Sequence, residues 1–195
     1  MPFERYADDD IAHCRTEKQA QEMRKAIAER LQSCGLELHP EKTKIVYCKD
    51  DWRKKTYPNE KFDFLGYGFR ARRSKNRKGK FFINFSPAVS NKAAKAMRDK
   101  FRRWQLPKRS DKAIEDLSRM FNPIIRGWIQ YYGRYYRSAL YPTMRELNRD
   151  LALWAKRKYK KLRHHLRRAT HWIARISRRA PELFATGRWG CGVAP

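Results

Sequence analysis

The chain has 195 residues, of which 41% are hydrophobic and 13% aromatic, and this excludes both a disordered basic tail and a large multidomain enzyme. Lys and Arg number 47 against 20 Asp and Glu, and the net charge of +27 predicts a polyanionic partner, nucleic acid above all. Residues 1–66 hold 13 basic and 13 acidic side chains whereas residues 67–195 hold 34 and 7, which indicates a neutral part followed by a strongly basic part.

The first predicted elements are a β-hairpin and a helix. Residues 3–5 and 11–14 are short β-favouring runs. The acidic triplet at 8–10 has the composition of a turn, so its carboxylates are expected at the apex of the hairpin. A capping box at 16–19, followed by apolar residues at steps of three and four, predicts a helix over 16–34.

The next segments carry further β-strand patterns. Leu36 and Leu38 alternate with polar residues and residues 44–48 include a β-favouring run, so two strands are expected there. Alternating aromatic residues over 62–69 and the run at 81–85 predict a second hairpin, connected by a basic turn that contains a glycine.

From residue 87 onward the pattern changes to the helical period of 3.6. Pro123 is expected to kink the second helix of this region, and Pro142 suits the first turn of the third. The four predicted helices cover about 88–105, 110–137, 141–164 and 167–179.

These patterns predict an α+β fold in three parts. The first part, 1–86, combines short strands with one helix, and the second part, 87–180, is helical throughout. The third part, 181–195, is rich in glycine and is expected to be an irregular tail.

The chain shows no sign of secretion or of a membrane span. It has no run of about 18 apolar residues, and its first residues lack the apolar segment of a signal peptide. The cysteines are widely separated and form no metal-binding pattern, which fits reduced thiols; they are Cys14, Cys34, Cys48 and Cys191. A cytoplasmic location without membrane contact is expected.

The sharpest motif is Tyr6-Ala7-Asp8-Asp9 in the predicted hairpin. Adjacent carboxylates on a rigid turn supply the oxygen ligands that divalent cations prefer, and Mg²⁺ is the natural candidate. The alternative is a solvated acidic turn, because so short a motif often arises by chance.

The order of the motifs resembles that of one protein family. The hairpin is followed by a helix, by residues 35–44 (GLELHPEKTK) and by residues 62–67 (FDFLGY), as in the second half of the palm of bacterial group II intron reverse transcriptases. Residues 121–132 (FNPIIRGWIQYY) resemble the maturase-specific domain X, which forms the thumb of that family. The resemblance covers nearly the whole chain, and it implies a partial palm followed by a helical thumb.

The resemblance implies roles for residues of the palm. Asp8 and Asp9 would bind metal in a two-metal Mg²⁺ site, and Tyr6 and Ala7 would form its floor near the primer end. Lys42 matches a family lysine that donates a proton or neutralises phosphate charge, although an exposed loop lysine explains it equally well. The family's primer grip, which holds the primer terminus, falls on Phe64, Leu65, Gly66 and Tyr67.

The resemblance also implies that parts of the family's enzyme lie outside this sequence. A complete member has fingers and a first palm half, which supply a third catalytic aspartate and the nucleotide-binding residues. The two-metal site is therefore expected to be incomplete, and the chain alone to be inactive unless an N-terminal reverse transcriptase fragment joins it. The sequence after residue 180 has one cysteine and no histidine, so no endonuclease domain is expected.

The basic part offers cations for phosphates and aromatic rings for unpaired bases. Tyr131 and Tyr136 are the stacking candidates, whereas Trp128, Tyr132 and Tyr135 share a helical spacing that is typical of core packing. The predicted RNA-binding residues are Arg70, Arg72, Arg73, Lys75, Arg77, Lys78, Lys80, Arg126, Tyr131, Arg134, Tyr136, Lys156, Arg157, Lys160, Lys161, Arg163, Arg167 and Arg168.

Two functions fit these features. The first is an RNA-directed DNA polymerase and maturase, which copies an RNA template from a DNA primer and assists the splicing of structured intron RNA. The alternative is a non-catalytic RNA-binding splicing cofactor in which Asp8 and Asp9 have lost their role. A basic ribosome-associated structural protein is a third reading, which the ordered palm motifs disfavour.

Overall fold

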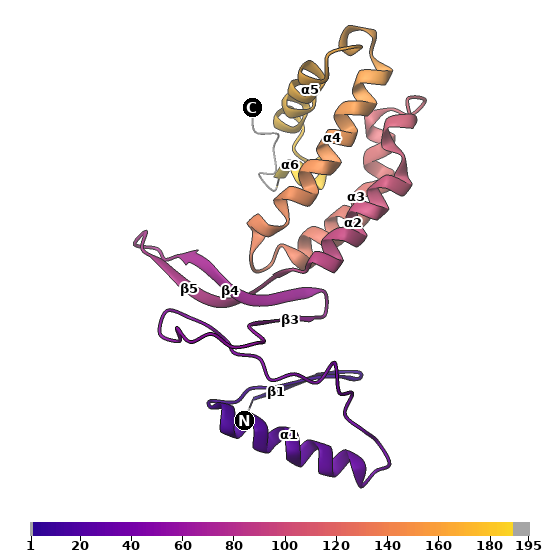
Figure 1. The fold of residues 1–195 in the computed structure, drawn as a ribbon. Coiled ribbons are helices and arrows are strands. Elements are labelled where there is room, and N and C mark those ends of the chain that lie inside the picture. Colours follow the sequence, from indigo (N-terminus) through magenta and orange to yellow (C-terminus); the bar gives the residue numbers. More distant parts are fainter. Residues whose placement is uncertain (1, 189–195) are drawn as a thin grey trace. The chain divides into compact units, whose positions relative to one another are not determined.

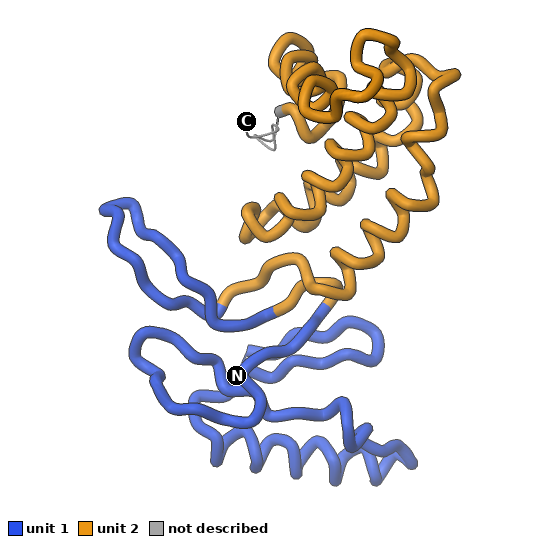
Figure 2. Tube along the Cα trace, turned by 45° about the horizontal axis from the view of Figure 1, so that its top comes forward, with its two compact units in different colours: residues 1–64, 69–85 blue, residues 65–68, 86–195 orange. Residues whose placement is uncertain are grey.

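The computed structural model describes residues 2–188, and it confirms the predicted α+β fold (Figure 1). Short antiparallel strands and one helix come first, and helices dominate from residue 91 onward. The chain divides into two compact units, shown in Figure 2: unit 1 comprises residues 1–64 and 69–85, and unit 2 comprises residues 65–68 and 86–195.

Unit 1 begins with a tight β-hairpin. Strands β1 (Phe3–Tyr6) and β2 (Asp9–Ala12) pair antiparallel, with Tyr6 opposite Asp9, so the turn contains only Ala7 and Asp8. The expected apex at 8–10 is therefore corrected, because Asp9 and Asp10 already belong to β2. Ala7 has a φ of 52°, and a positive φ at the first turn position matches the right-handed twist of paired strands.

Helix α1 (Glu17–Gln32) begins at the predicted capping box. The Thr16 hydroxyl accepts the backbone N–H of Gln19 at 3.2 Å, and the Gln19 side chain accepts the N–H of Arg15 at 2.8 Å. The apolar face of α1 is only half-buried, and no residue of the helix is fully buried. Local capping therefore defines this helix more than core packing does.

The two strands expected between residues 36 and 48 are absent from the described structure, where this stretch is irregular. Isolated bonds replace a ladder: the Tyr47 N–H donates to the Asn59 carbonyl at 2.8 Å, and the Asn59 side chain donates to the Ile45 carbonyl at 3.4 Å. A β-favouring run forms a strand only where a neighbouring strand pairs with it, and here no continuous partner is present within residues 2–188.

A three-stranded sheet contains the second predicted hairpin, but the strand expected over 62–69 is divided by a turn at Leu65 and Gly66. Its strands β3 (Lys61–Phe64), β4 (Tyr67–Lys75) and β5 (Phe81–Val89) lie in the order β3-β4-β5. Phe62 stacks on Phe69 with ring centroids 4.7 Å apart and lies 6.0 Å from Phe85. The alternating aromatics that predicted the hairpin thus form its apolar face.

The helices of unit 2 are α2 (Asn91–Trp104), α3 (Ile114–Tyr132), α4 (Tyr141–Lys158), α5 (Leu166–Arg179) and α6 (Ala185–Arg188). Helix α3 starts later than Ser110, because the Asp116 carboxylate accepts the N–H of Ala113 at 3.1 Å and caps the helix there. It is one continuous helix through Pro123, whereas Pro142 lies in the first turn of α4 as predicted.

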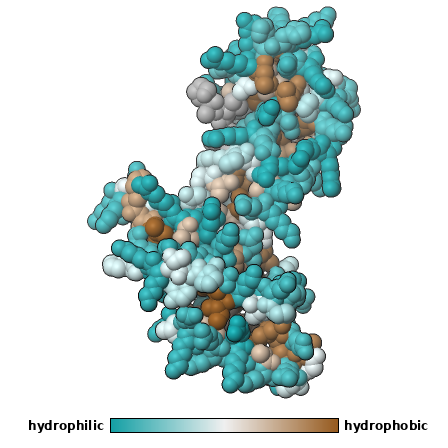
Figure 3. All heavy atoms as spheres, viewed as in Figure 1, coloured by the Kyte–Doolittle hydropathy of each residue, from teal (hydrophilic) through white to brown (hydrophobic). Residues whose placement is uncertain are grey.

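The hydrophobic core belongs to unit 2. Helix α4 packs against α5 and α2, and its Trp154 is fully buried with its indole N–H donating to the Arg109 carbonyl at 2.9 Å. By contrast, no residue of the described range 2–66 is fully buried. Figure 3 shows hydrophobic side chains at the surface of the molecule. In unit 1 the exposed large hydrophobic residues include Phe3, Leu36 and Trp52.

The expectation of an irregular tail is wrong for residues 185–188, which form α6, whereas residues 181–184 form a turn and a bend. Phe184 and Thr186 are buried, and α6 includes the latter. Asn122 of α3 binds this segment with both ends of its amide: its N–H donates to the Leu183 carbonyl at 2.7 Å, and its oxygen accepts the Ala185 N–H at 3.0 Å. The rest of the predicted tail, residues 189–195, lies outside the described residues. Within the described part, no helix is both long and apolar enough to cross a bilayer.

Candidate active site and nucleic-acid interface

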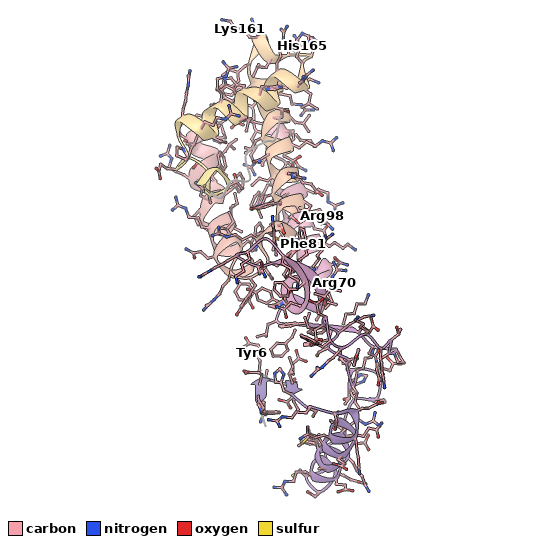
Figure 4. The ribbon with its side chains drawn as sticks, turned by 90° about the vertical axis from the view of Figure 1, so that its left-hand side faces the viewer. Tyr6, Arg70, Phe81, Arg98, Lys161 and His165 are labelled. Carbon is pink, nitrogen blue, oxygen red and sulfur yellow. The ribbon has the colours of Figure 1, made fainter. Side chains whose placement is uncertain are left out.

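The acidic hairpin presents two carboxylates to solvent. Asp8 lies in the turn and Asp9 opens β2, and both are exposed. Asp10 differs from them, because it lies opposite Arg5 and its carboxylate is 3.8 Å from the Arg5 guanidinium. The side chain of Tyr6 is also exposed on this hairpin (Figure 4). Asp8 and Asp9 are therefore the pair on this hairpin that is open to a cation.

The fit of this pair to Mg²⁺ is partial. Exposed carboxylate oxygens are the ligands that a hard divalent cation prefers. However, no group of three or more His, Cys, Asp or Glu side chains that could hold a metal ion occurs in the described residues. Asp8 and Asp9 can supply part of a metal site, and further ligands have to come from elsewhere.

Lys42 lies in an irregular loop and is exposed. The loop turns at His39, whose carbonyl accepts the N–H of Thr43 at 3.0 Å. Between residues 2 and 188 no hydrogen bond or ion pair joins Lys42 to Asp8 or Asp9. The structure therefore does not bring the predicted catalytic lysine into contact with the carboxylates.

The predicted primer-grip segment contains a tight turn between β3 and β4. Its two central residues, Leu65 and Gly66, have φ angles of 50° and 77°, which is the signature of a type I′ hairpin turn. The Gly66 carbonyl accepts the N–H of Ser90 at 2.9 Å. A Cβ atom on Gly66 would lie 2.6 Å from the Tyr132 hydroxyl, so both the φ angle and the close approach require glycine here.

Two tyrosines fasten this turn to the end of α3. The Tyr67 hydroxyl donates to the Tyr131 carbonyl, and the Tyr131 hydroxyl donates to the Leu65 carbonyl at 2.9 Å. Burial raises the pKa of Tyr67 to about 12, with smaller contributions from the neighbouring Tyr131, Tyr135 and Tyr132. A phenol with so high a pKa stays protonated at neutral pH and remains a hydrogen-bond donor.

The tyrosines differ in part from the sequence expectations. Tyr131, a stacking candidate, is 47% exposed, but its ring packs 5.1 Å from Tyr67. Tyr135, expected in the core, is 58% exposed, while the other stacking candidate, Tyr136, is half-buried. Trp128 and Tyr132 pack against the core as expected. The helical spacing wrongly predicted a core position for Tyr135, because α3 ends at Tyr132, three residues earlier.

The first basic surface is the hairpin of β4 and β5. Its turn is closed by Asn76, whose side chain accepts the N–H of Lys80 at 2.9 Å and whose carbonyl accepts the N–H of Gly79 at 3.0 Å. Arg72 is half-buried, and the remaining predicted cations are exposed, namely Arg70, Arg73, Lys75, Arg77, Lys78 and Lys80. Figure 4 labels Arg70 on β4 and Phe81 on β5.

The second basic surface lies at the end of α4 and the start of α5. Lys156 is half-buried, and Arg157 donates to the Pro107 carbonyl at 3.3 Å, so these two predicted RNA-binding residues also serve the fold. Figure 4 labels Lys161 and His165 in this region. The other predicted cations of this surface are exposed, namely Lys160, Lys161, Arg163, Arg167 and Arg168. Two more predicted cations, Arg126 on α3 and Arg134 just after it, are also exposed.

Two protein-family models match the chain. Residues 1–69 match the reverse transcriptase (RNA-dependent DNA polymerase) family, and residues 94–172 match the maturase-specific domain of group II introns. The two matches follow each other in the order that the motifs had indicated. The chain belongs to the group II intron reverse transcriptase/maturase family. Comparisons with curated proteins and with solved structures gave no significant match.

Membership of the group II intron reverse transcriptase/maturase family connects the two parts of the chain to function. The acidic hairpin and the Leu65–Gly66 turn lie within the reverse transcriptase match, and helices α3 and α4 lie within the maturase match. Reverse transcriptases use divalent metal ions, and both domains imply nucleic-acid partners, including intron RNA. Residues 70–93, which include the basic hairpin, lie between the two matches.

Proposed function

We propose that the chain acts as the palm end and thumb of a group II intron reverse transcriptase/maturase in the bacterial cytoplasm. Its partners are structured intron RNA, an RNA template and a DNA primer. The Leu65–Gly66 turn carries this proposal, because it lies at the family's primer-grip position and is hydrogen-bonded to Tyr131 at the end of a maturase helix. A turn held in this way gives a primer terminus a fixed support.

In this proposal Asp8 and Asp9 supply two carboxylates of the polymerase site. Mg²⁺ bound there would activate the primer hydroxyl and stabilise the leaving pyrophosphate. Tyr6 lies on the same hairpin, and the exposed Lys42 would supply positive charge to the phosphates once the missing segment completes the site. Because the described residues contain no group of three or more His, Cys, Asp or Glu side chains that could hold a metal ion, and Asp10 faces Arg5, we propose that a further segment or a second polypeptide supplies the third carboxylate and that the lone chain does not extend primers.

The exposed cations at the end of α4 and the start of α5 would hold intron RNA through its phosphates. Binding that releases counterions weakens steeply as salt concentration rises. Filter binding of the intron RNA and of a scrambled RNA of equal length, at two salt concentrations, tests this role. We expect tighter binding of the intron RNA, and equal affinity for the two RNAs would refute a maturase function.

A matched pair of variants locates the RNA surface. The double variant Arg163→Gln/Arg167→Gln removes two exposed cations from the second basic surface. Arg24→Gln removes an exposed cation from α1, which lies in the neutral part of the chain. The first variant is expected to weaken intron binding and flatten its salt dependence, and the second to leave both unchanged.

One observation favours the alternative of a splicing cofactor without polymerase activity. Residues 2–66 bury no side chain completely, so the part that carries Asp8 and Asp9 has little core of its own. The two functions separate in an in vitro splicing assay combined with primer extension. With the missing reverse transcriptase segment supplied, a splicing cofactor would tolerate Asp8→Ala in every assay, whereas a reverse transcriptase would lose primer extension and retain intron binding.

A further inference from the structure

The basic hairpin contains a groove whose strand residues, 71–73 and 81–83, lie outside both family matches. Strands β4 and β5 line it together with Asp51 from the preceding loop, and all of these residues belong to unit 1. The groove has a volume of about 320 Å³. Ligand-binding hollows commonly span roughly 300–1,000 Å³, so the groove has room for a small planar group.

Phe81 is the exposed aromatic ring of this groove. Its side chain is 52% exposed, and the neighbouring Ile83 on β5 is 41% exposed. The guanidinium carbon of Arg73 lies 3.9 Å from the Phe81 ring centroid, and the Lys75 ammonium lies 5.6 Å from it. The Arg73 guanidinium therefore lies over one face of the phenyl ring, and this stacked pair of planar groups forms a platform on which another aromatic ring can stack.

The groove has a positive region, formed by cations of β4 and of the turn after it, and a negative region at Asp51. Arg72, Arg73 and Lys75 provide positive charge along β4, and the turn that follows adds Arg77, Lys78 and Lys80. Asp51 lines the groove as well, and its carboxylate accepts the N–H of Ile83 at 2.9 Å. This carboxylate repels a phosphate but accepts a hydrogen bond from the N–H groups of a base. A ligand with a neutral ring inside the groove and phosphates outside it matches both regions.

We propose that this groove binds an unpaired base of single-stranded RNA. The base stacks on the platform that Phe81 and the overlying Arg73 form, and its N–H groups face Asp51, while the flanking phosphates contact the cations of residues 70–80. A base within a duplex is already paired and stacked, so the groove distinguishes single-stranded from double-stranded RNA. The inference rests on the RNA binding proposed above and assigns a specific contact to the basic hairpin.

Fluorescence anisotropy on the full chain tests this contact with two probes, a labelled single-stranded oligoribonucleotide of mixed sequence and the same sequence as a duplex. Stacking of one base contributes a factor of roughly 5 to 100 in affinity, so Phe81→Ala is expected to weaken single-strand binding by that factor. Duplex binding should change by less than about twofold, because duplex RNA is held through phosphates. Phe81→Trp should retain single-strand binding.

Arg77→Gln is the matched control, since it removes a phosphate-binding charge from the turn and leaves the ring in place. It is expected to weaken binding of both probes equally. Photo-crosslinking of a thiouridine-containing single strand to the unaltered chain gives a second readout that does not depend on a variant. The cross-linked peptide is expected to contain residues 71–83.

Each other outcome is decisive. Three results would refute base binding in the groove. Phe81→Ala could weaken binding of both probes equally, it could weaken neither, or the cross-links could be confined to other peptides. Competition by polyglutamate that disappears in Phe81→Ala would identify an acidic polypeptide as the occupant and would also refute base binding. If the unaltered chain binds neither RNA, the proposed function itself is refuted. If the chain binds RNA and Phe81→Ala does not change the affinity, only the proposed role of the groove is refuted.

Discussion

The Tyr67 hydroxyl donates a hydrogen bond to the Tyr131 carbonyl, while the Tyr131 hydroxyl donates at 2.9 Å to the carbonyl of Leu65, two residues before Tyr67. The Tyr131 carbonyl lies in the last turn of α3, where a helix leaves its carbonyls without intrahelical partners. Tyr67 therefore caps the helix, and Tyr131 holds the turn in return. The Leu65–Gly66 turn and the end of α3 thus support each other.

Removing the two hydroxyls should therefore have coupled effects. Tyr67→Phe is expected to lower the free energy of unfolding by about 1–3 kcal/mol, because it leaves the Tyr131 carbonyl without its partner. Tyr131→Phe should cost about 0.5–1.5 kcal/mol, since this side chain is half exposed. Urea unfolding of both single variants and the double variant gives the coupling energy. Strict additivity would show that the two bonds act independently.

Gly66→Ala is expected to lower the free energy of unfolding by about 1–3 kcal/mol, because alanine is strained at a φ of 77° and its Cβ meets the Tyr132 hydroxyl. Gly127→Ala is the matched control within unit 2. Gly127 lies inside α3 with open space around it, so alanine should stabilise the helix by about 0.5–1 kcal/mol. A neutral Gly66→Ala would contradict the described turn.

The outcome for particular elements shows what local sequence can predict. Thr16 and Gln19 cap α1 as expected, and Pro142 opens α4, because both effects depend on neighbours within one turn of helix. The strands expected around Leu36 and Ile45 did not form, because a strand depends on a distant pairing partner that the β-favouring residues themselves do not specify.

The sequence also predicted only part of the candidate site. The hairpin that carries Asp8 was predicted, although its turn lies at Ala7 and Asp8 and not at 8–10. The turn at Leu65 and Gly66 was not predicted, because the alternating aromatics over 62–69 indicated one strand. The hydrogen bonds from Tyr67 to Tyr131 and from Tyr131 to Leu65 join residues 64 and 66 positions apart, and nothing in either local pattern points to the other. Arg157 was expected at an RNA surface for its charge alone, and only the fold shows that it binds the Pro107 carbonyl.

The raised pKa of Tyr67 predicts a loss of stability at high pH. The folded state holds this proton more tightly than the unfolded state, whose tyrosine has the ordinary pKa of 10.0. The contribution is therefore complete below pH 10 and is lost as the pH rises toward about 12. The free energy of unfolding should fall more steeply over this interval in the unaltered chain than in Tyr67→Phe. Parallel pH profiles would show that Tyr67 is not responsible.

Asn122 should hold the segment that leads into α6. Asn122→Ala removes the acceptor of the Ala185 N–H and a donor to the Leu183 carbonyl, and it is expected to lower the free energy of unfolding by about 1–3 kcal/mol. Limited chymotrypsin digestion should then cleave near Phe184, which is buried in the unaltered chain. Asn91→Ala, at an exposed position of α2, is the control and should not change the cleavage pattern.

Primer extension on an RNA template with Mg²⁺ tests the central claim most directly. The chain is assayed alone and after addition of a reverse transcriptase segment that carries fingers and the first palm half. We expect no extension by the chain alone, extension by the combination, and its loss in the combination with Asp8→Asn. Extension by the lone chain would contradict the claim that Asp8 and Asp9 need further ligands. Extension by the combination that carries Asp8→Asn would show that Asp8 is not a metal ligand.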